Sequence, residues 1–299
     1  MTRQKIVPHL WFNKEAQEAA EFYVEAFGLD SKMSDLTMLH DTPSGDAAVV
    51  SFQIWGYEFM AISAGPLFKF NPSISFMVNF DPALDKDARE HIDEVWDRLS
   101  QGGIPLMPLD AYPFSERFGW IQDKYGVTWQ LIYTNPEGEE RPLIIPSFLF
   151  VGDVCGRAEE ATDYYLSVFK NSRRGALQRY PAGVEPDQEG TIMFTDFQLE
   201  GQWFVAMDSA HEHNFAFNEA ISLMVKCEDQ TEIDYYWDKL SAVPEAEQCG
   251  WVKDQFGVSW QIVPANMGEL LAKNPEKVTP VMLEMKKIVI SDLVKAGES

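Results

Sequence analysis

The chain has 299 residues, which is enough for about two domains that each bury a core. Its composition, 45% hydrophobic and 13% aromatic, favours packed globular structure over disorder. A formal charge of −23 argues against nucleic acid and anionic membranes as partners. The chain has only three scattered cysteines and no apolar stretch near the ~18 residues of a membrane helix, so we expect a cytoplasmic protein.

The first predicted elements form a β-α-β-β-β module. Hydrophobic periodicity predicts a strand, an amphipathic helix and three further strands at residues 6–12, 16–27, 32–40, 47–54 and 58–64. The order then restarts with a strand, a helix, short strands and a final strand, at residues 74–80, 87–100 and, for the last strand, 128–133. Residues 101–118 are interpreted mainly as a loop.

The second half of the chain repeats the first. The strip Gly119–Gln130 recurs as Gly250–Gln261 with seven identical positions, and residues 92–100 match residues 233–241. The repeats predict one domain at residues 1–137 and a second at 143–265, each of two modules. The Pro-rich polar run at residues 135–142 is the expected linker.

Residues 266–299 have no counterpart in the first copy. Two helices are predicted there, at 267–273 and 278–293, on either side of Asn274-Pro275. We expect this tail to pack on its own domain or on a dimer partner; a regulatory role is the alternative.

The repeated motifs resemble a known family. Phe217–Val225, Trp237–Ser241, Gly250–Asp254 and Gly257–Pro264 resemble the PhnB-like family, often labelled "3-demethylubiquinone-9 3-methyltransferase". The first copy is similar through Phe22-Tyr23, Phe70-Asn71-Pro72 and its own Gly119–Gln130 strip. The resemblance implies an α+β fold of tandem glyoxalase-like (vicinal-oxygen-chelate) domains, in which paired βαβββ modules form a half-open barrel around a pocket. It also implies a homodimer.

Metal-dependent members of this superfamily carry two His and a Glu on the first and last strands of their modules, and this sequence departs from that set. The corresponding strand positions are Val7 or His9, Ile145 or Ser147, Ser73 or Ser75, Ala220 or Ser222, Gln130, and Gln261. Amides and hydroxyls are weak ligands, so we expect no tightly bound catalytic metal. His9 is the one candidate ligand, and a hydrogen-bonded wall residue is its other interpretation.

The sequence also lacks a cofactor motif. It has no Gly-x-Gly for a nucleotide-like cofactor, which argues against reading methyl transfer from the family label. It identifies neither a cofactor nor a catalytic residue.

What remains is a predicted pocket of aromatic and neutral polar groups. Its expected residues are Trp11, Trp120 and Trp251, with His9 and Gln130 in the first copy and Ser147 and Gln261 in the second. Trp129 and Trp260 are expected in the core because they face away from the adjacent glutamines. The first hypothesis is a small-molecule-binding protein without a conventional catalytic metal. The alternative is a metal-dependent lyase, isomerase or dioxygenase with a weak site around His9.

Overall fold

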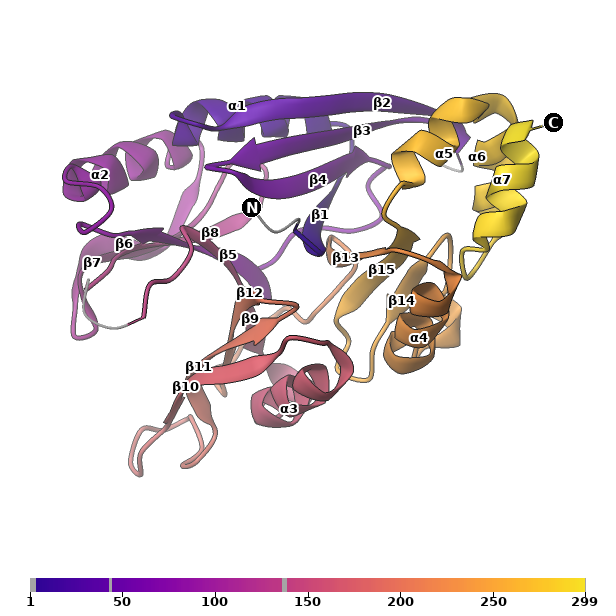
Figure 1. Cartoon of the computed structure of the whole chain (residues 1–299). Coiled ribbons are helices and arrows are strands. Elements are labelled where there is room, and N and C mark those ends of the chain that lie inside the picture. The colour runs from indigo at the N-terminus through magenta and orange to yellow at the C-terminus, as the bar shows by residue number, and fades with distance from the viewer. Residues whose placement is uncertain (1–3, 43–44, 136–138, 299) are drawn as a thin grey trace. The chain divides into compact units, whose positions relative to one another are not determined.

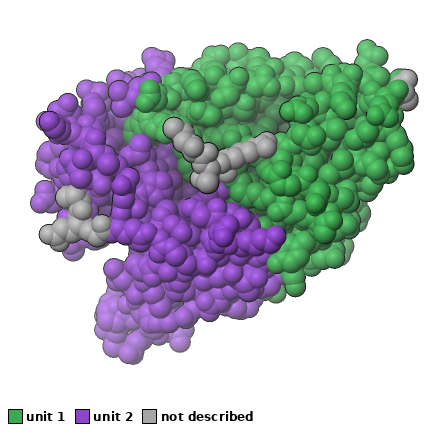
Figure 2. Space-filling model, viewed as in Figure 1, with its two compact units in different colours: residues 1–24, 30–69, 217–299 green, residues 25–29, 70–216 purple. Residues whose placement is uncertain are grey.

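The computed structural model describes residues 4–42, 45–135 and 139–298, and it contains helices and two β-sheets (Figure 1). The chain divides into two compact units, which Figure 2 colours separately. Unit 1 comprises residues 1–24, 30–69 and 217–299, and unit 2 comprises residues 25–29 and 70–216. None of the helices in the described ranges is long and apolar enough to cross a membrane.

Unit 1 contains a seven-stranded sheet in the order β14-β15-β13-β1-β4-β3-β2. Its elements are β1 (Ile6–Phe12), α1 (Ala16–Phe27, whose last residues count with unit 2), β2 (Lys32–Thr42), β3 (Gly45–Ile54), β4 (Tyr57–Ser63), β13 (Ile221–Cys227), α4 (Gln230–Leu240), the short 3-10 helix η2 (Pro244–Ala246), β14 (Trp251–Lys253), β15 (Ser259–Pro264), α5 (Met267–Lys273), α6 (Pro275–Glu284) and α7 (Ile290–Glu298).

Unit 2 contains an eight-stranded sheet in the order β10-β11-β12-β9-β5-β8-β7-β6. Its elements are β5 (Ile74–Phe80), α2 (Ala88–Leu99), β6 (Ile104–Tyr112), β7 (Ser115–Gln122), β8 (Thr128–Tyr133), β9 (Ile144–Phe150), the short 3-10 helix η1 (Gly152–Val154), α3 (Ala158–Val168), β10 (Arg173–Arg179), β11 (Ile192–Leu199) and β12 (Gln202–Asp208). The α+β class and the tandem duplication expected from the sequence are thus confirmed.

Each sheet joins modules from different copies of the repeat. In unit 1, β1 of the first module pairs antiparallel with β13 of the fourth. In unit 2, β5 of the second module pairs antiparallel with β9 of the third. The sequence interpretation instead joined the two modules of one copy. Because β5 and β13 both read as buried strands of similar sequence, the local pattern does not distinguish their partners. The copy boundaries 1–137 and 143–265 stay a prediction.

Stacked aromatic rings fill the space between helices and sheets. In unit 1, Tyr23 of α1 stacks on Phe52 of β3, which stacks on Phe59 of β4, at centroid distances of 5.9 and 5.2 Å. In unit 2, Phe204 of β12 stacks between Phe148 and Phe197. The opposite face of each sheet is therefore the one left to carry a site.

The repeated strip is held by a buried aspartate. Asp254 Oδ2 accepts a hydrogen bond from Trp260 Nε1 at 2.8 Å, and its Oδ1 accepts from the backbone N–H groups of Phe256 and Val258. Asp123 binds Trp129 and the equivalent turn of unit 2 in the same way. Both tryptophans are fully buried, which confirms their predicted place in the core.

The C-terminal tail contains three helices instead of two. Helix α5 is confirmed, whereas the single helix predicted over 278–293 is wrong, because α6 ends at Glu284 and α7 begins at Ile290. The intervening carbonyls of Met285 and Lys286 accept hydrogen bonds from Cys249 N and Gly250 N, at 2.8 and 2.7 Å. This tertiary pairing replaces the hydrogen bonds that would continue a helix.

Two further sequence expectations concern connections. Residues 101–118 are mostly the hairpin of β6 and β7 and not a loop. Strand β6 lies at the sheet edge, is largely exposed and carries Pro105 and Pro108, so it lacks the alternation of a half-buried strand. Residues 136–138 of the predicted linker lie outside the described residues.

Candidate functional site

Strand register brings the polar residues of unit 1 together on one face of its sheet. His9 lies opposite Ser222 of β13, and Gln261 of β15 lies beside Trp251 of β14. Gln261 Nε2 donates a hydrogen bond to Ser222 Oγ at 2.9 Å. We call the surface formed by these four residues and Trp11 the His9 face, since alternation along each strand directs all five side chains the same way.

His9 is the unusual member of this face. It is only 4% exposed, and its Nδ1 has no hydrogen-bond partner among the described residues. Burial lowers its pKa from 6.5 to about 4, so the imidazole is neutral near pH 7. Buried polar atoms are nearly always satisfied, so this nitrogen points to a ligand or a water molecule.

Aromatic rings lie beside the imidazole. The rings of His9 and Trp251 meet edge to face with centroids 5.7 Å apart. Trp11 meets Trp251 at 5.8 Å and Phe68 at 5.2 Å, again edge to face. Trp11 Nε1 donates to the carbonyl of Gly65 at 2.9 Å, which fixes the orientation of that ring. These three rings thus form an aromatic wall beside the imidazole of His9.

The His9 face also carries an apolar cluster. Its buried members are Val7, Met224 and Val263. The partly buried side chains of Met60 and Met267 pack against them. Met267 comes from α5, so the tail contributes to this face. Flexible methionine side chains adapt to the shape of an apolar neighbour.

The charged groups near this face are paired. Lys226 Nζ lies 2.6 Å from Glu58 Oε1, and Lys253 Nζ lies 2.5 Å from Glu219 Oε1. Lys226 follows Met224 by two residues on β13, and Lys253 follows Trp251 by two on β14, so alternation places both lysines on the same side of the sheet. Each lysine is therefore neutralised by a glutamate, and the two pairs bring no net charge to the His9 face.

Unit 2 has an equivalent arrangement without the histidine, which we call the Ser147 face. Ser147 lies opposite Ser75, and Gln130 Nε2 donates to Ser75 Oγ at 2.7 Å and to Ser147 Oγ at 3.5 Å. Trp120 lies beside Gln130, and its buried Nε1 has no partner among the described residues. The polar row of this face is thus internally bonded apart from one indole N–H.

The Ser147 face is partly covered by its own residues. Trp203 packs against Met77, Ile145 and Val205. The guanidinium of Arg141 lies 3.8 Å from the centroid of the Trp203 ring, and Arg141 Nε donates to Asp196 at 2.8 Å. A cation stacked on an indole and anchored by a buried carboxylate holds that ring in place.

The structure changes how the predicted site residues are grouped. The sequence grouped His9 with Gln130 and Ser147 with Gln261. The structure brings His9, Trp11, Trp251 and Gln261 together in unit 1, and Ser147, Gln130 and Trp120 in unit 2. This correction follows from the pairing of modules between copies. Sequence reasoning missed Met267, Trp203 and Arg141, although the Arg141-containing linker and the Met-rich tail were visible signals.

The residues of the His9 face do not fit the metal set implied by the superfamily. One imidazole, one hydroxyl and one amide supply no carboxylate and only one strong ligand for a divalent cation. Among the described residues, no group of three or more His, Cys, Asp and Glu side chains could hold a metal ion. We therefore derive no step through a metal.

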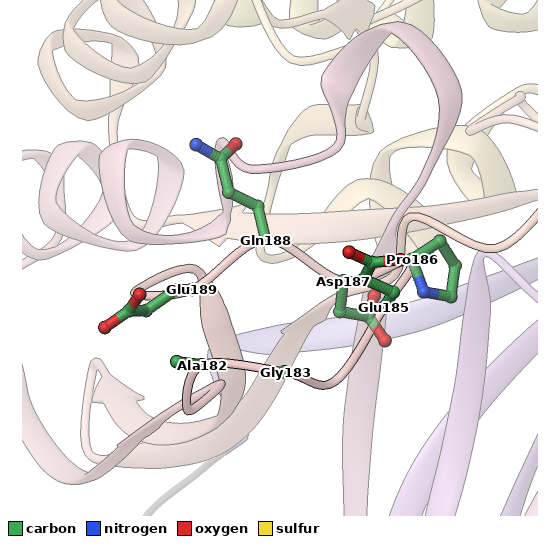
Figure 3. Close-up of a pocket in the computed structure, with 7 residues that line it drawn as sticks. All are labelled: Ala182, Gly183, Glu185, Pro186, Asp187, Gln188 and Glu189. Atoms are coloured by element: carbon green, nitrogen blue, oxygen red, sulfur yellow. The ribbon is translucent and has the colours of Figure 1, made fainter.

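The structure also contains a surface hollow of about 700 Å3 along a single loop, from Ala182 to Glu189 (Figure 3). Asp187 in this loop is bonded to the backbone N–H of Ala210 at 2.7 Å. None of the predicted site residues lines the hollow, and its acidic side chains do not converge on one point.

Comparison with known proteins assigns the chain to a family. The family model described as 3-demethylubiquinone-9 3-methyltransferase matches residues 4–132 and again residues 142–263. The chain belongs to this family. Both copies of the repeat are thus members of the 3-demethylubiquinone-9 3-methyltransferase family. No match to a curated protein was found.

The chain is also similar to solved structures. A PhnB protein from Bacillus cereus is 36% identical, and the match covers 44% of this chain and 100% of that chain with a TM-score of 0.39. A protein from Pseudomonas aeruginosa is 23% identical over 44% of this chain and 97% of its own, with a TM-score of 0.34. Glyoxalase I from Zea mays is 12% identical with a TM-score of 0.53, over 89% of this chain and 96% of its own. The last likeness shows the glyoxalase-like fold alone.

Proposed function

We propose that the protein binds a small molecule on the His9 face, without a conventional catalytic metal. The observation that carries this proposal is the buried Nδ1 of His9, which has no partner among the described residues although the Trp251 ring packs against the imidazole and the bonded Ser222–Gln261 pair lies on the same face. Aromatic and apolar side chains with a few directed polar groups are typical of small-molecule sites.

The family name does not decide the activity. Family members share a fold, and the chemistry depends on the residues of the site. The sequence lacks the glycine-rich turn that Rossmann-type enzymes use for nucleotide cofactors, so methyl transfer is not part of this proposal.

The Ser147 face supports the choice of unit 1. Its Gln130, Ser75 and Ser147 side chains bond to one another, which leaves the N–H of Trp120 without a partner among the described residues. Trp203 and Arg141 cover the neighbouring apolar residues. A ligand there would have to displace a stacked ion-paired arginine. We therefore assign the Ser147 face a mainly structural role.

A ligand-observed NMR screen of small neutral aromatic compounds tests the assignment. The screen uses the wild type, His9→Ala, and Ser147→Ala as the matched control at the equivalent position of unit 2. We expect compounds whose binding is lost in His9→Ala and retained in Ser147→Ala. Compounds that bind all three proteins equally would contradict the assignment to the His9 face.

The alternative function, a metal-dependent lyase, isomerase or dioxygenase, has a separate test. Zinc, iron, manganese and nickel are measured after purification without a metal-affinity column. Near-stoichiometric metal that disappears in His9→Ala would replace our proposal with the enzymatic one. The homodimer implied by the family resemblance stays a prediction, which light scattering would test.

A further inference from the structure

The chemistry of the His9 face restricts the ligand that it can accept. A neutral imidazole has one N–H donor and one bare acceptor nitrogen, and either nitrogen can carry the proton. No described residue bonds Nδ1, so the protein does not select the tautomer through that atom. A hydroxyl group can donate to a bare nitrogen or accept from an N–H, and so it matches both tautomers.

The surroundings of His9 favour a flat and uncharged molecule. Trp11 and Trp251 contribute aromatic rings to this face, and Met224 and Met267 belong to its apolar cluster. The lysines on this side of the sheet are already neutralised by Glu58 and Glu219. An anionic ligand would therefore lose hydration without gaining an unpaired cation.

From these observations we propose that the His9 face binds an uncharged aromatic molecule bearing a hydroxyl group, a phenol-like ligand, whose hydroxyl pairs with His9 Nδ1. This inference rests on the proposed function and adds the chemical class of the ligand. Edge-to-face and sulfur–aromatic contacts would hold the ring, and the hydroxyl would satisfy the buried nitrogen.

Three naphthalenes of similar size test this class by isothermal titration at pH 7. The probes are 2-naphthol, 2-methylnaphthalene and 2-naphthoate, which differ in one substituent. A net hydrogen bond is worth about 1 kcal/mol, and an unsatisfied buried group costs more, so we expect 2-naphthol to bind about tenfold more tightly than 2-methylnaphthalene. We expect 2-naphthoate to bind more weakly than 2-naphthol.

Two variants show whether His9 causes the preference for 2-naphthol over 2-methylnaphthalene. In His9→Leu the order should reverse, because the methyl compound is the more apolar one. His9→Gln retains a group that both donates and accepts, so it should keep part of the preference for 2-naphthol. Circular dichroism spectra establish that each variant is folded before titration.

The outcomes separate the two proposals. Equal binding of 2-naphthol and 2-methylnaphthalene by the wild type would overturn the phenol-like class and leave a small-molecule site on the His9 face. A preference for 2-naphthol that survives unchanged in His9→Leu would also overturn it. If the wild type binds none of the probes, the phenol-like class is rejected. The ligand-observed NMR screen described above then tests the proposed function by itself.

Discussion

The imidazole of His9 meets the indole of Trp251 edge to face, with centroids 5.7 Å apart and ring planes at 90°. The two residues come from strands that are more than two hundred positions apart in the sequence and share one sheet. This contact places a neutral polar group beside an aromatic wall, and it gives the His9 face measurable properties.

The stability of the protein should depend on the protonation of His9. Its pKa is 6.5 in the unfolded chain and about 4 in the folded protein. Between these values the unfolded state binds a proton that the folded state excludes, so the free energy of unfolding falls as the pH falls. From pH 7 to pH 4, His9 should contribute a loss of roughly 3 kcal/mol.

Urea titrations at a series of pH values test this dependence. In His9→Leu, the decrease in the free energy of unfolding between pH 6.5 and pH 4 should be smaller than in the wild type. His40→Gln, a substitution at a histidine whose side chain is 64% exposed, is the control variant. A wild-type slope in His9→Leu would contradict the prediction.

Replacing Asp254 by Ala should lower the free energy of unfolding by about 3 kcal/mol, because Trp260 Nε1 and two backbone N–H groups lose their acceptor. Asp123→Ala makes the same change in unit 2 and should cost a similar amount. Thermal or urea denaturation measures the free energy of unfolding of both variants. An effect below about 1 kcal/mol in either variant would show that these bonds do not hold the turns.

Gly250→Ala should destabilise the protein by about 2 kcal/mol or more, because a Cβ there would lie 2.9 Å from the carbonyl oxygen of Ile262 and 3.2 Å from Ile288 Cγ1. Gly56→Ala is the matched control, since Gly56 also has a positive φ but has no atom within 4 Å of the added carbon. The control should cost only about 1 kcal/mol. Equal costs would mean that neither Ile262 nor Ile288 of the tail packs closely on this turn.

Arg141→Ala should lower the free energy of unfolding by about 1–3 kcal/mol, because Trp203 loses its stacked guanidinium and Asp196 loses an ion-pair partner. Arg141→Lys keeps the charge without the planar group and should recover only part of the loss. Urea denaturation compares the three proteins. Full recovery by lysine would show that charge alone accounts for the contact.

Much of the fold could be predicted because its periodic signals are local. The bounds predicted for β1, α1, β5, β8 and α5 agree with the structure, since each combines a clear apolar period with a turn signal. The end of α6 could not be predicted, because residues 285 and 286 bond to Cys249 and Gly250, far away in the sequence. Exposed edge strand β6 likewise lacks a buried face that would leave a pattern.

The site was predictable residue by residue but not as a group. The ligand positions of the superfamily that the sequence resembles identified His9, Gln130, Ser147 and Gln261 as candidates, and strand alternation placed Trp129 and Trp260 in the core, where the structure has them. Which candidates share a face depends on the pairing of β1 with β13, and β5 offers nearly the same edge pattern. The pairing of strands that are far apart in the sequence depends on the packing of the complete sheet. The sequence of a single strand therefore does not determine its partner.

The central claim, that His9 is a neutral buried group within an aromatic wall, is tested most directly by an NMR titration of its imidazole. The wild type is labelled with 15N-histidine, His9→Gln assigns the signal, and the ring nitrogen shifts are followed from pH 8 to pH 3.5. We predict a neutral ring at pH 7 and a midpoint of about 4. A midpoint at or above 6.5 would contradict the account.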